Sequence, residues 1–437
     1  MVRYSFNLEC KLLKLIYVVI DGMGDRPIPE LGGKTTLEAA NTPHMDSLAK
    51  AGKTGLMYTV GKGLAPESDV AVVSILGYDP FKYHVRRGVL ESIGACLHME
   101  NGDLALRCNL ATLAVDNTIV DRRAGRDLTQ QEANGLTRAI NDQLRLESYP
   151  ATAELKSTST YRVSLVVKSE NSDLSDNIDN TDPAYKRVNG IGVADLDASM
   201  VLKRCNPLEQ TEDAENSAKI INEFTQKSMV ILDNHEINKK RVKDGKLKAN
   251  VLLCRDAGSI VPQFPFLCDK YDLSFVCLSD MNVERGISRL VGMSLVDLPA
   301  PSKDLEYDCK LRVKKLLQVL PDHDCFYVHI KGPDEPGHDG DCKRKAKLIS
   351  IIDKYFVGNM LHQIDLQDTV ICITADHATP CDLKGHSDDP VPVLISGNKV
   401  HADKVQSFSE SRCEKGELGV FGKGTELLPL LVKYIKK

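Results

Sequence analysis

Short apolar runs that end in polar residues recur along the chain. The runs 15–20, 325–330 and 369–373 are rich in β-branched and other apolar residues and are short, so we predict buried parallel strands rather than helices. The polar residues that follow them are Asp21 after the first run, Asp334 and His338 after the second, and Asp376, His377 and His386 after the third. The carboxyl ends of parallel strands meet at one edge of a sheet, so these side chains are expected to converge there.

This combination of residues predicts a metal centre. Three carboxylates and three imidazoles form a mixed oxygen and nitrogen site, which suits Mn²⁺, Zn²⁺ or Co²⁺ better than Ca²⁺. Crowded carboxylates repel one another unless cations lie between them. We therefore expect two divalent metal ions rather than one.

Ser68 is a candidate nucleophile. It precedes an apolar helical segment that Gly77 and Pro80 end. One interpretation is an N-cap, whose hydroxyl accepts a hydrogen bond from the first helical turn. The other is a nucleophile whose phosphorylated form lies at the positive end of the helix. The predicted metal centre favours the second, because a serine hydroxyl bound to a metal ionises near neutral pH.

Composition and charge exclude several classes of protein. The 437 residues predict two or three domain-sized units. The net charge of −5, with Lys and Arg spread along the chain, argues against a nucleic-acid partner. No apolar run approaches the ~20 residues of a membrane helix, so no membrane partner is expected. Thirteen cysteines without CxxC spacing do not predict a disulfide framework, which favours a cytoplasmic protein.

The middle of the chain, from about 94 to 262, has a different character. The segment 121–126 holds three arginines, which form either a solvated basic turn or an anion site. The planar guanidinium binds carboxylates and phosphates through two parallel hydrogen bonds. The charged run 238–246 predicts a solvated surface.

Four segments in order resemble the archaeal-type cofactor-independent phosphoglycerate mutases of the alkaline phosphatase superfamily. They are 21–27, 66–71, 331–341, and 376–377 together with 385–392. The resemblance spans nearly the whole chain. It implies an α/β fold with an alkaline-phosphatase-like, mostly parallel sheet flanked by helices, formed by residues 1–93 and 263–437. An α+β cap domain, residues 94–262, is inserted between them.

The resemblance also implies a reaction and its cofactors. The reaction interconverts 3-phosphoglycerate and 2-phosphoglycerate through a phosphoserine at Ser68, in glycolysis and gluconeogenesis. The cofactors are two divalent ions, usually Mn²⁺, with Zn²⁺, Co²⁺ and Mg²⁺ as alternatives and without 2,3-bisphosphoglycerate. The implied ligands are Asp334, His338 and His386 for one ion, and Asp21, Ser68, Asp376 and His377 for the other.

Substrate residues follow from the same resemblance. The arginines expected to hold the carboxylate and phosphate of phosphoglycerate are Arg87, Arg122, Arg123, Arg126 and Arg255. Asp121, beside them, is a candidate acid or base for the glycerate hydroxyls. The chain departs from the family at Arg86, Asp256 and Arg285, where the family usually has glycine, glycine and lysine. None of these three is an expected metal ligand.

Two other functions are compatible with these residues. The same centre serves a metal-dependent phosphomonoesterase or a mutase for another phosphosugar. Hydrolysis of the phosphoserine would distinguish a phosphomonoesterase from a mutase. A non-catalytic metal-binding scaffold is a further alternative, against which the complete ligand set argues. The sequence leaves the oligomeric state open.

Overall fold

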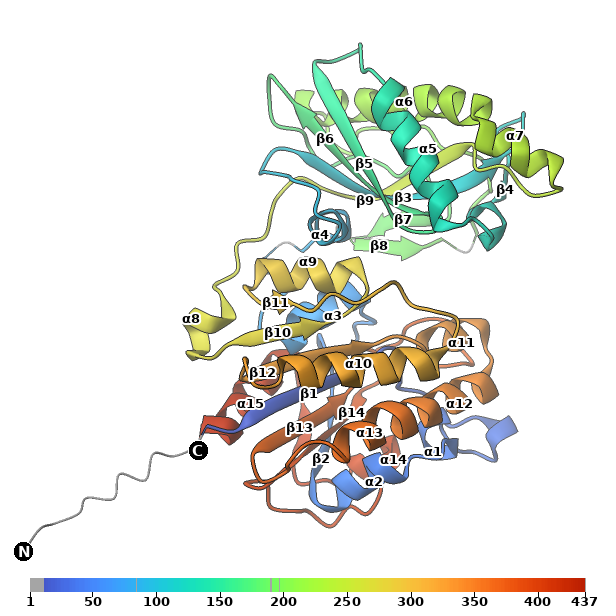
Figure 1. The fold of residues 1–437 in the computed structure, drawn as a ribbon. Coiled ribbons are helices and arrows are strands. Elements are labelled where there is room, and N and C mark those ends of the chain that lie inside the picture. The colour runs from blue at the N-terminus through green and yellow to red at the C-terminus, as the bar shows by residue number, and fades with distance from the viewer. Residues whose placement is uncertain (1–11, 84, 189–190, 196, 437) are drawn as a thin grey trace, which may run out of the picture. The chain divides into compact units, whose positions relative to one another are not determined.

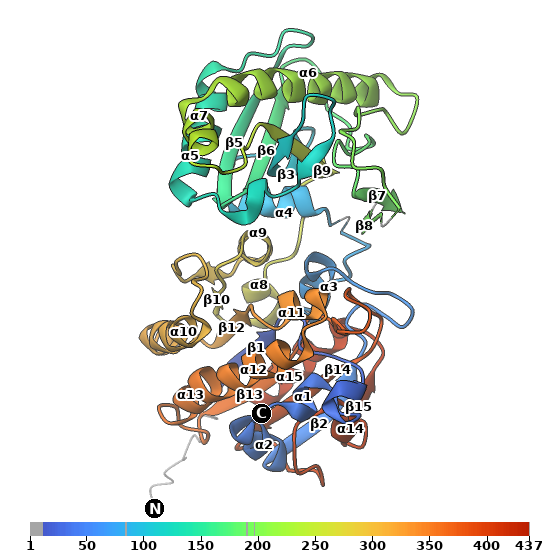
Figure 2. The ribbon, with the colours of Figure 1, turned by 90° about the vertical axis from the view of Figure 1, so that its right-hand side faces the viewer.

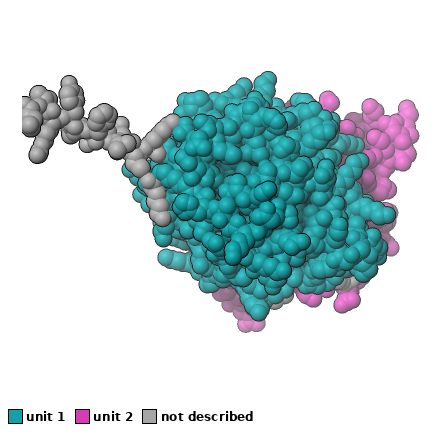
Figure 3. All heavy atoms as spheres, turned by 90° about the horizontal axis from the view of Figure 1, so that it is seen from below, with its two compact units in different colours: residues 1–83, 264–280, 287–437 teal, residues 84–263, 281–286 magenta. Residues whose placement is uncertain are grey.

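The computed structural model describes residues 12–83, 85–188, 191–195 and 197–436. The chain forms two compact units, which Figure 3 shows in different colours. Unit 1 comprises the residues up to Tyr83, Phe264–Asp280, and the residues from Ile287 onward. Unit 2 comprises the residues after Tyr83 up to Gln263, with Met281–Gly286. Unit 2 is therefore inserted into the chain of unit 1.

Unit 1 is built on an eight-stranded sheet of order β11-β10-β12-β1-β13-β14-β2-β15. The strands are β1 (Lys14–Ile20), β2 (Gly52–Met57), β10 (Phe275–Leu278), β11 (Ser294–Leu295), β12 (Cys325–Ile330), β13 (Thr369–Thr374), β14 (Val391–Gly397) and β15 (Gly419–Phe421). Every neighbouring pair is parallel except β13 with β14 and β14 with β2. The predicted fold class, a mostly parallel sheet, is confirmed.

The three strands predicted from apolar runs lie side by side at the centre of this sheet, in the order β12, β1, β13 (Figure 1). Ile20 of β1 pairs with Ile330 of β12, and Val19 of β1 pairs with Thr374 of β13. The strands are buried on both faces, as expected for a sheet covered by helices. Their carboxyl ends therefore lie at one edge, as predicted.

Helices lie on both faces of the sheet in unit 1 (Figures 1 and 2). They are α1 (Thr36–Ala39), α2 (Pro43–Lys50), α3 (Ser68–Ile75), α8 (Leu267–Tyr271), α9 (Asn282–Leu290), which begins in unit 2, α10 (Leu305–Val319), α11 (Asp334–Asp339), α12 (Cys342–Ile352), the π-helical η3 (Asp353–Gly358), α13 (Asn359–Leu361), α14 (Glu410–Cys413) and α15 (Leu427–Lys436), with the short 3₁₀ turns η1 (Pro29–Leu31) and η4 (Gly424–Glu426). The apolar α15 packs against β1 and β13, which fixes the end of the chain to the central strands.

Unit 2 is an α+β structure with its own core. Its antiparallel sheet contains β3 (Leu104–Leu113), β4 (Ile119–Asp121), β5 (Ala151–Ser159), β6 (Arg162–Ser169) and β9 (Val251–Gly258), and a separate hairpin is formed by β7 (Tyr185–Val188) and β8 (Ile191–Ala194). The helices are α4 (Arg87–Gly94), the 3₁₀ turn η2 (Ala124–Arg126), α5 (Gln130–Gln143), α6 (Glu212–Asn234) and α7 (Glu236–Lys243). Leu106, Leu165 and Phe224 belong to the main core beneath α5 and α6, whereas Ala105 and Val89 belong to a smaller core beneath α4.

The division between the units differs in detail from the expected boundary after residue 93. Helix α4 packs against β3, β6 and β9, so the residues that follow Tyr83 belong to unit 2. No helix in the described part of the chain combines the length and the apolar character needed to cross a membrane.

The prediction that 238–246 is a solvated surface is wrong for two of its residues. Asn238 and Arg241 are each 1% exposed. The Arg241 guanidinium contacts Asp127 and Glu132 at 2.5 and 3.3 Å. A buried arginine is stable here because acceptors surround it.

Candidate metal centre

The ends of β1 and β13 bring Asp21 and Asp376 together. The backbone N–H groups of Gly22 and His377 donate to Asp376 Oδ1 at 3.2 and 3.1 Å. His377 Nε2 lies 3.4 Å from both Asp21 Oδ1 and Asp376 Oδ2. Gly22 has φ +61, and a Cβ there would lie 2.8 Å from Asp334. Glycine is therefore required where the turn after β1 passes the first residue of α11.

Ser68 reaches this cluster from the start of α3. Its Oγ lies 3.2 Å from His377 Nε2, and the side chain is buried. The N-cap residue of α3 is Glu67, so the interpretation of Ser68 as an N-cap is wrong. The hydroxyl instead faces the carboxylates and imidazole at the positive end of the helix.

Asp334, His338 and His386 form a second cluster. Asp334 Oδ1 lies 3.5 Å from His338 Nε2 and 3.4 Å from His386 Nε2. His338 Nδ1 lies 3.2 Å from Lys384 O, and His386 Nδ1 lies 2.8 Å from Pro66 O. Carbonyl oxygens only accept hydrogen bonds, so both Nδ1 atoms donate, and in the neutral imidazoles both Nε2 atoms keep a lone pair. This is the usual arrangement of histidines that bind metals.

Thr379 connects the two clusters. Its hydroxyl donates to Asp334 Oδ1 at 2.7 Å and lies 3.1 Å from His377 Nδ1. The rings of His377 and His386 stack with their centroids 3.8 Å apart. The structure thus gathers all seven predicted ligands in unit 1.

The charges of the clusters perturb their pKa values in both directions. Burial opposes ionisation of Asp21, but Lys331, whose Nζ lies 3.2 Å from Asp21 Oδ2, together with the nearby histidines holds the pKa of Asp21 well below its usual range. Burial raises the pKa of Asp376. Burial also disfavours the charged form of His386, but Asp334 raises the pKa of His386 to about 9. The clusters therefore attract positive charge.

The residues present fit two divalent ions. Asp21 Oδ1 and Asp376 Oδ2 are buried without a hydrogen-bond partner among the described residues. Burying such oxygens is costly unless a cation compensates them. Two groups each place one ligand atom per residue within 4.8 Å of one another, namely Asp334, His338 and His386, and Asp21, His329 and Asp376.

Sequence reasoning missed His329, Lys331 and Lys345. His329 lies inside β12, and only the neighbouring strands show that it is near Asp21. Lys345 of α12 is completely buried, and its Nζ donates to Gly24 O at 2.9 Å and Thr379 O at 2.8 Å. Spacing along α12 gives no signal for this role, because Lys345 is one of several lysines in that segment.

Unit 2 contains a separate cluster of guanidiniums. Arg87 and Arg107 both face Glu91 Oε1, at 3.0 and 3.2 Å. Burial and the charge of Arg87 lower the pKa of Arg107 to about 9. Although burial opposes its ionisation, the charges of Arg107 and Arg87 lower the pKa of Glu91 to about 2. Arg107 was not among the predicted substrate residues.

Arg122 and Arg255 extend this cluster around Tyr185. Arg122 forms two hydrogen bonds with the buried Asp182, at 3.0 and 2.5 Å. The guanidiniums of Arg255 and Arg122 lie 3.7 and 5.0 Å from the centroid of the Tyr185 ring. Asp256, with φ +56, lies 3.9 Å from Arg255 and 4.0 Å from Arg107. A left-handed aspartate here adds a carboxylate where the resembled family usually has glycine.

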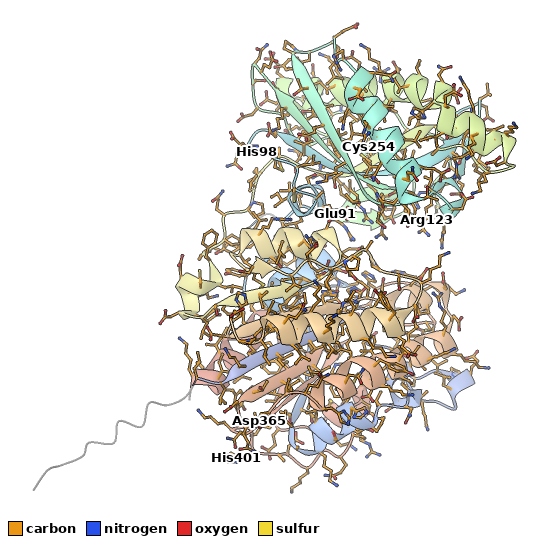
Figure 4. The ribbon with its side chains drawn as sticks, in the orientation of Figure 1. Glu91, His98, Arg123, Cys254, Asp365 and His401 are labelled. Atoms are coloured by element: carbon orange, nitrogen blue, oxygen red, sulfur yellow. The ribbon has the colours of Figure 1, made fainter. Side chains whose placement is uncertain are left out.

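Buried donors make this cluster suitable for anions. Nε of Arg107 and Nε of Arg255 are buried and make no well-aligned hydrogen bond among the described residues, although Arg107 Nε lies 3.2 Å from Glu91 Oε1 and Arg255 Nε lies 3.9 Å from Asp256 Oδ2. Arg123 lies over the Tyr161 ring instead, apart from the labelled Glu91 in Figure 4, and Arg126 is exposed. Asp121 Oδ1 accepts a hydrogen bond from the Arg123 backbone N–H at 2.6 Å. This contact does not test the role of Asp121 as acid or base, which stays a prediction.

Known proteins are similar to this chain in sequence and in fold. A sequence profile described as 2,3-bisphosphoglycerate-independent phosphoglycerate mutase matches residues 49–238. The mutase of that name from Aeropyrum pernix is 40% identical over 421 residues, covering 95% of this chain and 98% of the relative. The one from Methanopyrus kandleri is 38% identical, covering 96% and 95%.

Two solved structures are similar over almost the whole chain. A protein from Pyrococcus horikoshii has a TM-score of 0.78 at 31% identity and covers 98% of both chains. The cofactor-independent phosphoglycerate mutase from Thermoplasma acidophilum has a TM-score of 0.63 at 29% identity, covering 97% of this chain and 100% of that one.

The fold and the comparisons define a phosphoglycerate mutase in which an α/β sheet carries an inserted unit. More narrowly, the chain belongs to the family of 2,3-bisphosphoglycerate-independent phosphoglycerate mutases. The recognition made from the four sequence segments is confirmed.

Proposed function

We propose that the chain interconverts 3-phosphoglycerate and 2-phosphoglycerate with Ser68 as the carrier of the phosphoryl group. The observation that carries this proposal is the position of Ser68 Oγ, 3.2 Å from His377 Nε2 at the start of α3. The hydroxyl faces the cluster, and the positive end of a helix stabilises a phosphorylated serine.

The transfer proceeds in two steps. Ser68 Oγ loses its proton and attacks phosphorus, the bond between phosphorus and the substrate oxygen breaks, and that oxygen takes up a proton to give glycerate. The other hydroxyl of glycerate then loses its proton and attacks the phosphoserine, which regenerates Ser68. Asp121 is the proposed acid or base for the glycerate hydroxyls.

The seven predicted ligands hold two divalent ions in this proposal, one with Asp334, His338 and His386. When bound, the ions supply positive charge that lowers the pKa of the Ser68 hydroxyl and neutralises the phosphoryl oxygens. Mn²⁺ is the proposed ion, with Zn²⁺, Co²⁺ and Mg²⁺ as alternatives, because the site mixes carboxylates with imidazoles. No 2,3-bisphosphoglycerate is needed, since Ser68 carries the phosphoryl group.

The guanidiniums of unit 2 are the proposed ligands for the anionic groups of the substrate. The buried Nε atoms of Arg107 and Arg255, which make no well-aligned hydrogen bond within the described part of the chain, support this assignment. A cytoplasmic location is also proposed, because every described cysteine is a free thiol.

A coupled enolase assay, combined with mass spectrometry of the peptide that contains residue 68, tests the proposal. We expect wild-type protein quenched during turnover to carry a phosphoryl group on Ser68. Ser68→Ala should lower kcat by about 10⁴-fold or more, as for other nucleophiles. Ser74→Ala on the same helix is the matched control and should retain activity.

Two outcomes would overturn the mutase proposal. One is full turnover by Ser68→Ala, which would show that Ser68 does not carry the phosphoryl group. The other is ¹⁸O from labelled water in free phosphate, formed in place of the isomeric phosphoglycerate, which would indicate a phosphomonoesterase.

A further inference from the structure

His329 lies beside the carboxylate oxygens that have no hydrogen-bond partner. Its side chain is completely buried in β12, between β1 and β10. Its Nε2 lies 3.9 Å from Asp21 Oδ1 and 3.7 Å from Asp376 Oδ2. Those two oxygens are the atoms identified above as buried without a hydrogen-bond partner in the described chain.

These distances suit atoms that share one ion. Ligand atoms about 2.0–2.2 Å from a metal are separated from one another by roughly 3–3.5 Å. His377 Nε2 meets this spacing at 3.4 Å from each carboxylate oxygen. His329 Nε2 lies a few tenths of an ångström further out, so binding requires only a small inward movement.

The surroundings of Asp21 leave one oxygen for an ion. Lys331 Nζ lies 3.2 Å from Asp21 Oδ2. The ammonium therefore neutralises that oxygen, whereas Oδ1 faces both His329 and His377. A carboxylate held in this way presents a single ligand atom in a fixed direction.

Tyr327 orients the imidazole. Residues two apart on a strand share a face, and the Tyr327 hydroxyl lies 3.0 Å from His329 Nδ1. When Nδ1–H donates to the phenol oxygen, Nε2 carries the lone pair that a metal needs. This is the same arrangement that Pro66 O provides for His386.

We propose that His329 is a ligand of the ion held by Asp21 and Asp376, so that this ion has two imidazoles, His329 and His377. The proposal rests on the metal centre of the proposed function and adds a ligand to it. A second imidazole shifts the preference of this ion from Mg²⁺ towards Mn²⁺, Co²⁺ or Zn²⁺. Tyr327 acts as a positioning residue.

Binding of Co²⁺ to protein stripped of metal tests the assignment without reference to activity. Calorimetry should give two ions per chain for wild type, and visible absorption reports their ligands. In His329→Gln we expect one of the two ions to bind at least about 10-fold more weakly and its absorption band to change. Tyr327→Phe should weaken the same ion by a smaller factor. His401→Gln, an exposed histidine of unit 1 labelled in Figure 4, is the matched control and should bind both ions as wild type does.

X-ray absorption of the wild-type protein loaded with Co²⁺ gives an independent measurement, because it needs no variant. The proposal predicts four imidazoles over two ions, whereas the ligand set without His329 gives three. If His329→Gln and Tyr327→Phe bind both ions with wild-type affinity and spectrum, the assignment of His329 is overturned while the metal centre stands. Wild type that binds fewer than two ions would overturn the metal centre itself.

Discussion

At the scale of single residues, Thr379 shows how one hydroxyl can couple two metal sites. It donates to Asp334 Oδ1 and accepts from His377 Nδ1, so it fixes one ligand of each predicted ion. Residues that orient metal ligands in this way change metal affinity by about 10–100-fold when they are replaced. The hydroxyl acts through Asp334 and His377 and need not touch the substrate.

Thr379→Val should therefore weaken the binding of both ions. The valine keeps the shape of the side chain but removes the donor and the acceptor. Titration calorimetry with Mn²⁺ should show both affinities lowered by about 10-fold or more. Thr379→Ser, which keeps the hydroxyl, is the control and should bind nearly as wild type does. Unchanged affinity in the valine variant would mean that the ligands are held by other contacts.

Glu410 gives a pH dependence that is independent of the metal ligands. Its carboxylate accepts from the Asp25 N–H at 3.1 Å and the Thr35 hydroxyl at 2.7 Å, yet burial raises the pKa of Glu410 to about 7. The unfolded chain has the ordinary value of 4.5, so the native state holds more protons between pH 4.5 and about 7. The free energy of unfolding contributed by Glu410 is thus present at low pH and lost as pH rises through this window.

Glu410→Gln should remove the loss of unfolding free energy that accompanies the rise in pH. Urea unfolding of metal-free protein at pH 5 and pH 8 should show a smaller difference for the variant than for wild type. The contribution amounts to up to ~3 kcal/mol, since each pKa unit corresponds to about 1.4 kcal/mol. Glu414→Gln, exposed on the neighbouring turn, should keep the wild-type pH dependence. A wild-type slope in Glu410→Gln would show that Glu410 is ionised throughout.

The sequence indicated which residues at strand ends lie together in the structure, but it gave no signal for residues inside elements. Asp21, Asp376 and His386 were found because polar residues directly follow apolar runs or stand in a resembled segment. His329 was not found, because a histidine within a buried strand looks like part of the core until its neighbours are known. Arg107 was missed for the same reason within β3.

At the scale of elements, α12 fixes the two loops that carry the ligands. Lys345 donates to the carbonyls of Gly24 and Thr379 and pairs with Asp25 at 3.1 Å, so all three of its N–H bonds are used. Gly24 follows Asp21, and Thr379 follows His377. The helix thereby connects the end of β1 with the end of β13.

Lys345→Met should lower both stability and metal affinity. Breaking a buried ion pair leaves Asp25 without its cation, which costs about 3–5 kcal/mol. We expect that loss in the free energy of unfolding of metal-free protein. In the fraction that remains folded, calorimetry should show weaker binding of the ion held by Asp21, because the loop after β1 is released. Lys343→Met, exposed on the same helix, should change neither quantity. Wild-type metal affinity in Lys345→Met would restrict Lys345 to a structural role.

Elements with an unbroken apolar run were predicted well, whereas segments that mix charged and apolar residues were not. The predicted strand 325–330 corresponds to β12, because an unbroken apolar run has few alternatives. The run 238–246 was expected to be solvated, yet α7 buries Arg241 against Asp127 and Glu132. Charge alone could not reveal this, since the partners lie more than a hundred residues earlier in the chain.

At the scale of the whole molecule, one chain forms two compact units. The sequence predicted an insertion at 94–262, and the contacts in the structure divide the chain into two compact units, the second being formed by the residues after Tyr83 up to Gln263 with Met281–Gly286. The boundary could not be read from composition, because only the contacts of α4 with β3, β6 and β9 assign this helix to unit 2. All seven predicted ligands lie in unit 1, so metal binding and the core of unit 2 are separate physical features.

This separation predicts where metal ions stabilise the molecule. A ligand that binds only the native state adds RT ln(1 + [L]/Kd), about 4 kcal/mol when its concentration is about 1,000 times Kd. Hydrogen exchange should therefore slow in β1, β12 and β13 when Mn²⁺ is added to chelated protein. Exchange in β3 and β6 should stay unchanged, because unit 2 has its own core and none of these ligands. Ca²⁺ is the control ion, since imidazole ligands suit it poorly. Equal slowing in both units would mean that they unfold together, and no slowing in β1 would mean that the carboxylates at its end bind no metal.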